Sequence, residues 1–159
     1  MLQAKEDRFP VRKNPRLQSF DYTSCNYYFV TICTDQKKCV FGEPNRLSPI
    51  GKVAEECLQE IPVHCPEVTV DKWVVMPNHI HAIIILPGNG MNLSTIIGLY
   101  KSAVTKRARS FLADGNLWQA SFHDHVIRSQ QDYERIWLYV EGNPSRWMDD
   151  CFYTSKPDR

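Results

Sequence analysis

The chain has 159 residues, a formal net charge of +1 and 43% hydrophobic residues, a composition that excludes an intrinsically disordered protein and predicts one domain with its own core. Because the charge is nearly balanced, any affinity for nucleic acid must come from local clusters of basic residues. The apolar runs are too short to cross a bilayer and the N-terminus lacks the apolar segment of a signal peptide. We therefore expect a cytoplasmic protein that has no membrane partner.

Six cysteines are scattered along the chain and form no CxxC pair. In a chain long enough to bury a core, this pattern favours reduced structural thiols over a disulfide framework or a zinc cluster.

Residues 1–20 are polar and contain Pro10 and Pro15, which predicts a surface arm followed by a single domain over 21–159. Basic residues outnumber acidic ones in this arm, as contact with DNA phosphates would require, although an ordinary solvated tail explains the excess equally well. The basic residues are Lys5, Arg8, Arg12, Lys13 and Arg16.

The remaining elements alternate between strands and helices. Residues 26–34 (NYYFVTICT) are aromatic and β-branched and predict a first strand, and Pro49 begins a helix over 49–60 that Pro62 and Pro66 end. Two antiparallel strands follow around a Pro77-Asn78 turn, then a helix over 93–111 and a fourth strand over 118–127. This β-α-β-β-α-β order predicts an α+β, ferredoxin-like antiparallel sheet with both helices on one face.

A further helix is predicted after the fourth strand. The segment SQQD at 129–132 resembles a capping box, and the helix would run through Val140 until Gly142 and Pro144 end it. We expect this helix to cover the sheet face that the other two helices leave open.

The stretch WVVMPNHIHAIIILP contains two histidines, His79 and His81, within an apolar run. Alternate residues of a strand share a face, so both imidazoles are expected on the same side of the sheet. Such a pair is compatible with metal ligation and equally with buried histidines that bond to backbone carbonyls.

Tyr139 and Asn143 are four residues apart, so both side chains would project from one face of the last helix. Pro144 disfavours a helical backbone at Asn143, which places that residue at the helix terminus. One hypothesis is that His79, His81 and Asn143 bind a hard divalent cation and that Tyr139 is a nucleophile. From residue type alone, Tyr139 is more often a packing residue and Asn143 a helix cap.

Three segments, MPNHIHAIIIL, LWQASFHDHVIR and YERIWLYVEGNP, together resemble the REP-associated tyrosine transposases, bacterial members of the HUH endonuclease superfamily. The resemblance extends from YYFVTICT to the Asn-Pro pair at 143–144, which is most of the chain. The combination of His-hydrophobe-His with Tyr-x3-Asn-Pro is far more specific than either motif alone.

The resemblance implies a metal-dependent enzyme that nicks and rejoins single-stranded DNA at REP-type hairpins. His79 and His81 match the metal-binding pair, Asn143 the third ligand, and Tyr139 the tyrosine that forms a 5′-phosphotyrosine intermediate. The cation would be Mg²⁺ or Mn²⁺. Such a protein would act as a monomer or a homodimer.

The resemblance also suggests residues that contact DNA. The family's basic N-terminal region is implicated in recognising the sequence at the foot of the hairpin, and His125 matches a family histidine that would pack beside the active site or contact DNA. Lys101, on the basic surface of the helix over 93–111, belongs either to a phosphate track or to an ordinary solvated face. The residues assigned to DNA binding are therefore Arg8, Arg12, Lys13, Arg16, Lys101 and His125.

Other interpretations stay open at the level of sequence. One alternative is a nucleic-acid-binding module without catalysis, and another is a metal-dependent hydrolase in which water attacks and Tyr139 is structural. The HDH segment at 123–125 also places two histidines on one strand face and competes with His79 and His81 as a metal site.

Overall fold

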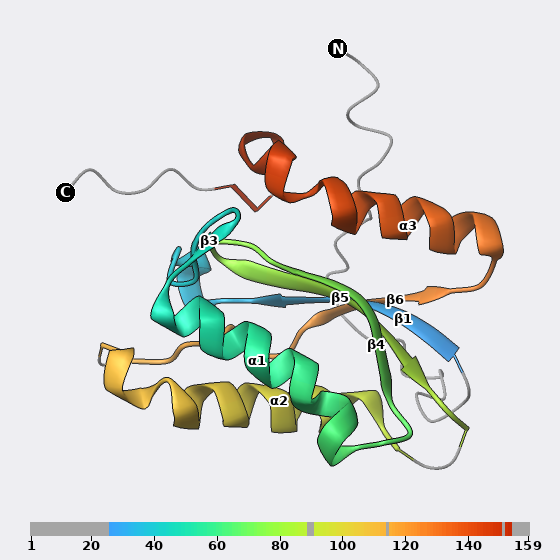
Figure 1. The fold of residues 1–159 in the computed structure, drawn as a ribbon, viewed down its shortest axis with the longest axis horizontal. Coiled ribbons are helices and arrows are strands. Elements are labelled where there is room, and N and C mark those ends of the chain that lie inside the picture. Colours follow the sequence, from blue (N-terminus) through green and yellow to red (C-terminus); the bar gives the residue numbers. More distant parts are fainter. Residues whose placement is uncertain (1–25, 89–90, 114, 151, 154–159) are drawn as a thin grey trace.

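The computed structural model describes residues 26–88, 91–113, 115–150 and 152–153, and over these residues an antiparallel sheet of four strands has helices on both faces (Figure 1). The strands lie in the order β4-β5-β1-β6. Helices α1 and α2 cover one face and α3 covers the other (Figure 1). The predicted α+β, ferredoxin-like architecture with an added C-terminal helix is confirmed.

The strands and connecting helices follow the predicted order along the chain. The strands of the sheet are β1 (Asn26–Cys33), β4 (Thr69–Val75), β5 (His79–Leu86) and β6 (His123–Ile127). The helices are α1 (Pro49–His64), α2 (Leu93–Arg107) and α3 (Gln130–Gly142). Each pair of neighbouring strands is antiparallel.

Strand β5 lies in the interior of the sheet and is covered on both faces. Its even-numbered residues, such as Ile80 and Ile84, belong to the large core beneath α1 and α2, whereas Ile83 belongs to a smaller cluster beneath α3. Burial on both faces accounts for the nearly continuous apolar sequence HIHAIIIL. It also means that the odd-numbered residues, including both histidines, face α3.

Helix α3 packs on the sheet through its apolar stripe. Ile136 and Val140 are 0% and 1% exposed and contact a cluster that contains Phe29, Ile83 and Ile127. The helix begins as predicted, with the Ser129 hydroxyl accepting a hydrogen bond from the backbone N–H of Asp132 at 3.1 Å.

A β-bulge on edge strand β4 supplies polar contacts to α3. The pairing register shifts between Val70 and Lys72, which leaves Asp71 as an extra residue. Asp71 accepts a hydrogen bond from the Tyr133 hydroxyl, while Lys72 pairs with Glu141 and lies 4.1 Å from the centre of the Trp137 ring. The bulge thus directs two consecutive side chains towards the same helix.

The predicted helix boundaries differ from those observed. Helix α1 continues to His64 with Pro62 inside its last turn, and α2 ends at Arg107, beyond which Arg109–Phe111 form a separate 3₁₀ turn. Proline removes only one backbone hydrogen bond, and so close to the C-terminus of α1 it does not end the helix.

The predicted fourth strand was too long. Strand β6 begins at His123, and Trp118 instead forms an isolated bridge with Thr34. Ser121 has a φ of 66°, in the left-handed region, which interrupts the extended backbone. A short hairpin, β2 (Gly42–Glu43) and β3 (Arg46–Leu47), was not predicted, and Gly42 enters it with a φ of 103° that suits glycine.

Truncating Ile136 tests the docking of α3. We expect Ile136→Ala to lower the free energy of unfolding by about 2–5 kcal/mol, because it leaves a cavity beneath the helix. Leu138→Ala, two residues away and 62% exposed, should change it by less than about 0.5 kcal/mol. Urea denaturation monitored by circular dichroism measures both, and equal losses would contradict the assigned packing.

Candidate metal centre and nucleophile

Two buried imidazoles lie side by side at the start of β5. His79 and His81 are 0% and 1% exposed, and their ring centroids are 4.5 Å apart. As predicted from the strand period, both rings lie on the same face of the sheet, the face that α3 covers.

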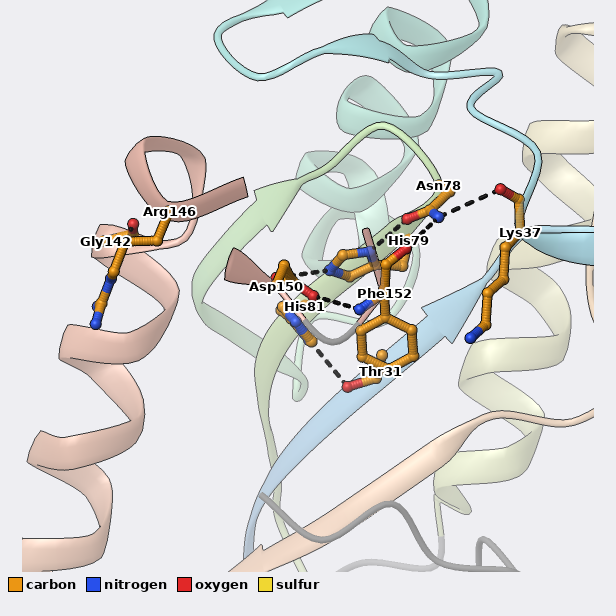
Figure 2. A network of polar contacts seen from close by, with 9 residues as sticks. All are labelled: Thr31, Lys37, Asn78, His79, His81, Gly142, Arg146, Asp150 and Phe152. Atoms are coloured by element: carbon orange, nitrogen blue, oxygen red, sulfur yellow. Dashed lines mark hydrogen bonds and ion pairs between the residues drawn. The ribbon is translucent and has the colours of Figure 1, made fainter. Parts of the chain in front are cut away.

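Each histidine is oriented through its Nδ1 atom. The Nδ1 of His79 lies 2.8 Å from the side-chain oxygen of Asn78, and the Nδ1 of His81 lies 2.9 Å from the hydroxyl of Thr31 on β1 (Figure 2). The amide oxygen of Asn78 can only accept, so Nδ1 of His79 carries the proton and Nε2 carries the lone pair. These neighbours therefore leave both Nε2 atoms for another partner.

Three buried polar atoms of the site make no hydrogen bond of good geometry among the described residues: Nε2 of His79, Nε2 of His81 and the side-chain oxygen of Asn143. The His79 and Asn143 side chains lie close enough to interact, and the weak contact between them leaves both atoms able to bind a cation. Asp150 lies beside them, with its side chain 1% exposed and its Oδ2 3.8 Å from Nε2 of His79 (Figure 2). One ligand atom from each of His79, His81 and Asp150 falls within 4.8 Å of the others.

Burial keeps both histidines neutral at physiological pH. Desolvation lowers the pKa of His79 well below its ordinary value, and the neighbouring His81 adds to this effect, while the Asn143 side chain opposes it. Desolvation lowers the pKa of His81 to about 3. Neutral imidazole is the form that binds metals.

The unpaired atoms fit a divalent cation. A buried polar group without a partner costs about 1–3 kcal/mol, and a cation that accepts the lone pairs of two imidazoles and one amide oxygen would remove that cost for all three. The Asp150 carboxylate adds a negative charge, which suits a cation further. The donor set of nitrogen and oxygen atoms therefore has the chemistry of a metal site.

Tyr139 projects from α3 towards the histidines. Its ring centroid lies 5.4 Å from that of His81 and 6.1 Å from that of Phe29. Asn143, at the C-cap of the same helix, is 3% exposed and lies near His79. The structure thus brings together all four residues that the sequence assigned to the site.

The second tyrosine of α3 is placed differently. The hydroxyl of Tyr133 donates to Asp71, and this bond raises the pKa of Tyr133 to about 12. Its ring packs edge-on against Tyr27, with the centroids 5.9 Å apart. The Tyr133 hydroxyl is bonded to Asp71, whereas the Tyr139 ring lies 5.4 Å from the His81 ring, so the geometry favours Tyr139 over Tyr133 as the nucleophile.

The segment that follows α3 covers the histidines. Within the 3₁₀ turn η4 (Pro144–Asp149), the Trp147 ring lies 6.0 Å from that of His79, and beyond this turn the ring of Phe152 lies 4.6 Å from it. The Asn78 amide donates to the backbone oxygen of Phe152 at 2.7 Å (Figure 2). Asp150 is held within this segment, since its Oδ1 accepts from the N–H of Phe152 at 2.8 Å.

One expectation about Asn143 was wrong. Pro144 was expected to keep Asn143 out of the helical conformation, but its φ and ψ of −60° and −44° are helical. The reason is that Pro144 begins a 3₁₀ turn that continues almost directly from α3. Asn143 nevertheless lies at the helix terminus, as predicted.

Two residues of the site were missed in the sequence. Asn78 was interpreted only as a turn residue, although its position directly before His79 is compatible with a bond to that ring. Asp150 belongs to an Asp-Asp pair beyond the helix, and no spacing in the sequence links it to the histidines.

The residues assigned to DNA binding lie in separate places. His125, on β6, faces α3, and its Nε2 lies 2.8 Å from the Asp132 carboxylate. Lys101 lies on α2, on the opposite face of the sheet from the histidines, and donates to the backbone oxygen of Gln119 at 3.0 Å. The arm residues Arg8, Arg12, Lys13 and Arg16 lie outside the described residues. The roles of all six in DNA binding stay predictions.

The competing histidine segment, residues 123–125, does not gather metal ligands in the described part of the chain. Among the described residues, the group of three side chains that could hold a metal ion consists of His79, His81 and Asp150. His123 and His125 flank Asp124, whose side chain is on the opposite face of β6 from theirs.

Residues 21–143 match the family model described as "Transposase IS200 like", and the chain belongs to this family of transposases. Transposases of this family act in DNA transposition and recombination, and the chain is accordingly a DNA-cleaving enzyme by family. Within the described residues, no helix combines the length and apolar character needed to span a membrane.

Individual relatives also match this chain over much of its length. An uncharacterized protein from Haemophilus influenzae is 30% identical over 89% of this chain and 93% of its own length. The REP-associated tyrosine transposase of Escherichia coli is 32% identical over 47% of this chain and 43% of its own length. The resemblance to REP-associated tyrosine transposases that the sequence suggested is thus confirmed.

A solved structure supports the fold. The structure of a REP-associated tyrosine transposase bound to a REP hairpin superposes with a TM-score of 0.66. The match covers 82% of this chain and 73% of that chain at 22% sequence identity. At this identity the similarity establishes the shared fold.

The buried histidines predict a dependence of stability on pH in metal-free protein. The unfolded histidines have a pKa of about 6.5, whereas folding lowers the pKa of His79 and His81. Below pH 6.5 the unfolded state binds more protons, so the free energy of unfolding should fall between pH 7 and 5, by up to about 1.4 kcal/mol per pH unit for each histidine.

Urea denaturation in EDTA at several pH values measures this dependence. His81→Gln should show a shallower slope because one of the shifted groups is gone. His64→Gln, whose wild-type side chain is 74% exposed, should retain the wild-type slope. A free energy of unfolding that is constant between pH 7 and 5 would contradict the burial of neutral histidines.

Proposed function

We propose that the protein is a metal-dependent, single-stranded DNA endonuclease and transposase that nicks and rejoins DNA beside REP-type hairpins through a 5′-phosphotyrosine on Tyr139. The observation that carries the proposal is the packing of the Tyr139 ring against His81, 5.4 Å between centroids, next to buried atoms that lack partners. Membership in the IS200-like transposase family supports the reaction class.

The cation would be Mg²⁺ or Mn²⁺, held by His79, His81 and Asn143. Imidazole nitrogen favours Mn²⁺, whereas the greater availability of Mg²⁺ in cells favours that ion. When bound, the cation would neutralise charge on the scissile phosphate and act as a Lewis acid. Both imidazoles are neutral and their Nδ1 contacts hold the rings in place, so neither ring has to lose a positive charge or reorient to face a cation.

Tyr139 supplies the nucleophile in this proposal. Its phenolic oxygen forms a bond to phosphorus while the bond from phosphorus to the 3′ oxygen of the preceding nucleotide breaks. The phenol loses its proton and the departing 3′ oxygen gains one, so the products are a 5′-phosphotyrosine and a free 3′-hydroxyl. Rejoining reverses these steps and needs no ATP, because the phosphodiester energy is retained in the covalent link.

The substrate is inferred from a relative. The solved neighbour carries a REP hairpin, and we extend that substrate to this chain as part of the proposal. The basic arm, with Arg8, Arg12, Lys13 and Arg16, would contact the DNA beside the hairpin.

A non-catalytic binding module is less well supported. RNA-recognition domains use an open sheet face on which bases stack, but here α3 packs on the face opposite α1 and α2. Buried histidines also contribute nothing to such a surface.

The nucleophile can be tested directly. Wild-type protein incubated with Mn²⁺ and a labelled single-stranded REP-type hairpin should give a protein-linked DNA band on a denaturing gel. Tyr139→Phe should abolish the band, a loss of at least a hundredfold, because the attacking oxygen is absent. Tyr133→Phe, on the same helix, should retain it.

Two other outcomes would each indicate a different function or mechanism. Cleavage that survives in Tyr139→Phe would mean that water is the nucleophile. Hairpin binding without cleavage by the wild-type protein would favour a binding module and contradict the proposed function.

Metal binding provides an independent test that does not depend on activity. Titration of Mn²⁺ monitored by electron paramagnetic resonance should detect one tight site, and His79→Gln and Asn143→Ala should each weaken it by roughly tenfold or more. Asp150→Asn tests whether the carboxylate near His79 strengthens binding. His64→Gln is the matched control, and an undiminished site in His79→Gln would contradict the assigned ligands.

A further inference from the structure

A polar cavity lies on the α3 face of the sheet, apart from the histidine pair. Its volume is about 390 Å³, within the range of small-molecule sites. Ile85 and Ile127 contribute apolar lining from two strands. Its other lining residues are Tyr27, Asp71, Arg128, Ser129, Gln130 and Tyr133.

This cavity is separate from the metal centre but lies along the same elements. Tyr133 precedes Tyr139 by six residues on α3, a distance of about 9 Å along the helix axis at 1.5 Å per residue. Tyr27 precedes Thr31 by four residues on β1, about 13 Å along an extended strand. A single strand of DNA with its phosphate at the histidines could reach the cavity within about three or four nucleotides, at 3.4 Å per stacked nucleotide.

The aromatic residues of the cavity are fixed and partly exposed. Tyr27 is 42% exposed, whereas Phe29, two residues further along the same strand face, is 4% exposed. The Tyr27 and Tyr133 rings meet edge to face at an interplanar angle of 82°. Asp71 holds the Tyr133 hydroxyl, so this ring is oriented before any ligand enters.

The polar residues provide the other contacts that a nucleotide requires. Arg128 lines the cavity, is exposed and can pair with a phosphate. Asp71, Ser129 and Gln130 supply acceptors and donors within reach of the edge of a base. An aromatic ring, hydrogen-bonding side chains and one cation form the set of groups that single-strand-binding proteins use for an unpaired base.

We propose that this cavity binds one unpaired nucleobase of the DNA strand whose phosphodiester lies at the histidine pair, with the base stacked on Tyr27 and a backbone phosphate near Arg128. The inference rests on the proposed function, because it requires a single-stranded substrate. In this proposal the pocket holds the DNA strand in position at a point a few nucleotides from the cleaved bond.

Abasic scanning tests the pocket by binding alone. Tyr139→Phe serves as the reference protein so that no cleavage occurs, and fluorescence anisotropy measures its affinity for hairpins in which each flanking nucleotide in turn is abasic. At one position the loss of the base should weaken binding roughly five- to a hundredfold, as expected for a stacked base. Adding Tyr27→Ala should weaken binding of the intact strand similarly and abolish the further effect of that abasic position.

Matched variants separate stacking from folding. Tyr27→Phe keeps the ring and should retain the affinity, and Tyr27→Leu should behave as Tyr27→Ala while preserving more of the packing. Leu99→Ala, 58% exposed on the opposite face, should have no effect. Two results would overturn the proposal. In one, the losses of affinity caused by Tyr27→Ala and by the abasic nucleotide are additive at every position. In the other, no abasic position weakens binding.

The two proposals fail in distinguishable ways. If wild-type protein forms the Tyr139-dependent adduct but no abasic position depends on Tyr27, the base pocket is wrong and the proposed function stands. If no adduct forms, the proposed function fails whatever the binding data show.

Discussion

The removal of two imidazoles from water is the constraint on which the site depends. Burial makes the charged form of His79 and His81 costly, so both rings are neutral and need partners for two nitrogens each. Asn78 and Thr31 satisfy the Nδ1 atoms. The two Nε2 atoms are therefore positioned by the protein rather than by solvent, and this makes the pair suitable for a cation.

That constraint requires a fixed cover, which α3 provides. The helix is attached at both ends: near its start the His125 ring pairs with Asp132, and near its end Glu141 pairs with Lys72. Between these contacts, Ile136 and Val140 are buried against the sheet. Exposed polar contacts contribute little on their own, so the apolar stripe supplies most of the docking energy. The docked helix places the Tyr139 ring against His81.

Much of this arrangement follows from local periodicity. The strand period alone places His79 and His81 on one face, and the helical period places Tyr139 and Asn143 together. Contacts that depend on tertiary structure do not follow from it. Asp150 reaches His79 only because a 3₁₀ turn redirects the chain after α3, and Asp71 reaches Tyr133 only because a bulge shifts the register of β4. The strand over 118–127 was also predicted too long. The positive φ of Ser121 interrupts the extended backbone, and no residue of strong turn preference marks this position in the sequence.

The candidate site lies on only one of the two faces of the sheet. Strand β5 contributes to both, because its even-numbered residues belong to the large core with α1 and α2 while its histidines face α3. Lys101 lies on the face that α1 and α2 cover, where its ammonium group donates to the backbone oxygen of Gln119 in the loop before β6. The base pocket, the tyrosine and the histidines all lie on the other side. Under the proposed function, a single strand that follows this face would meet these groups in order along β1 and α3, and α3 would place Tyr139 beside that strand.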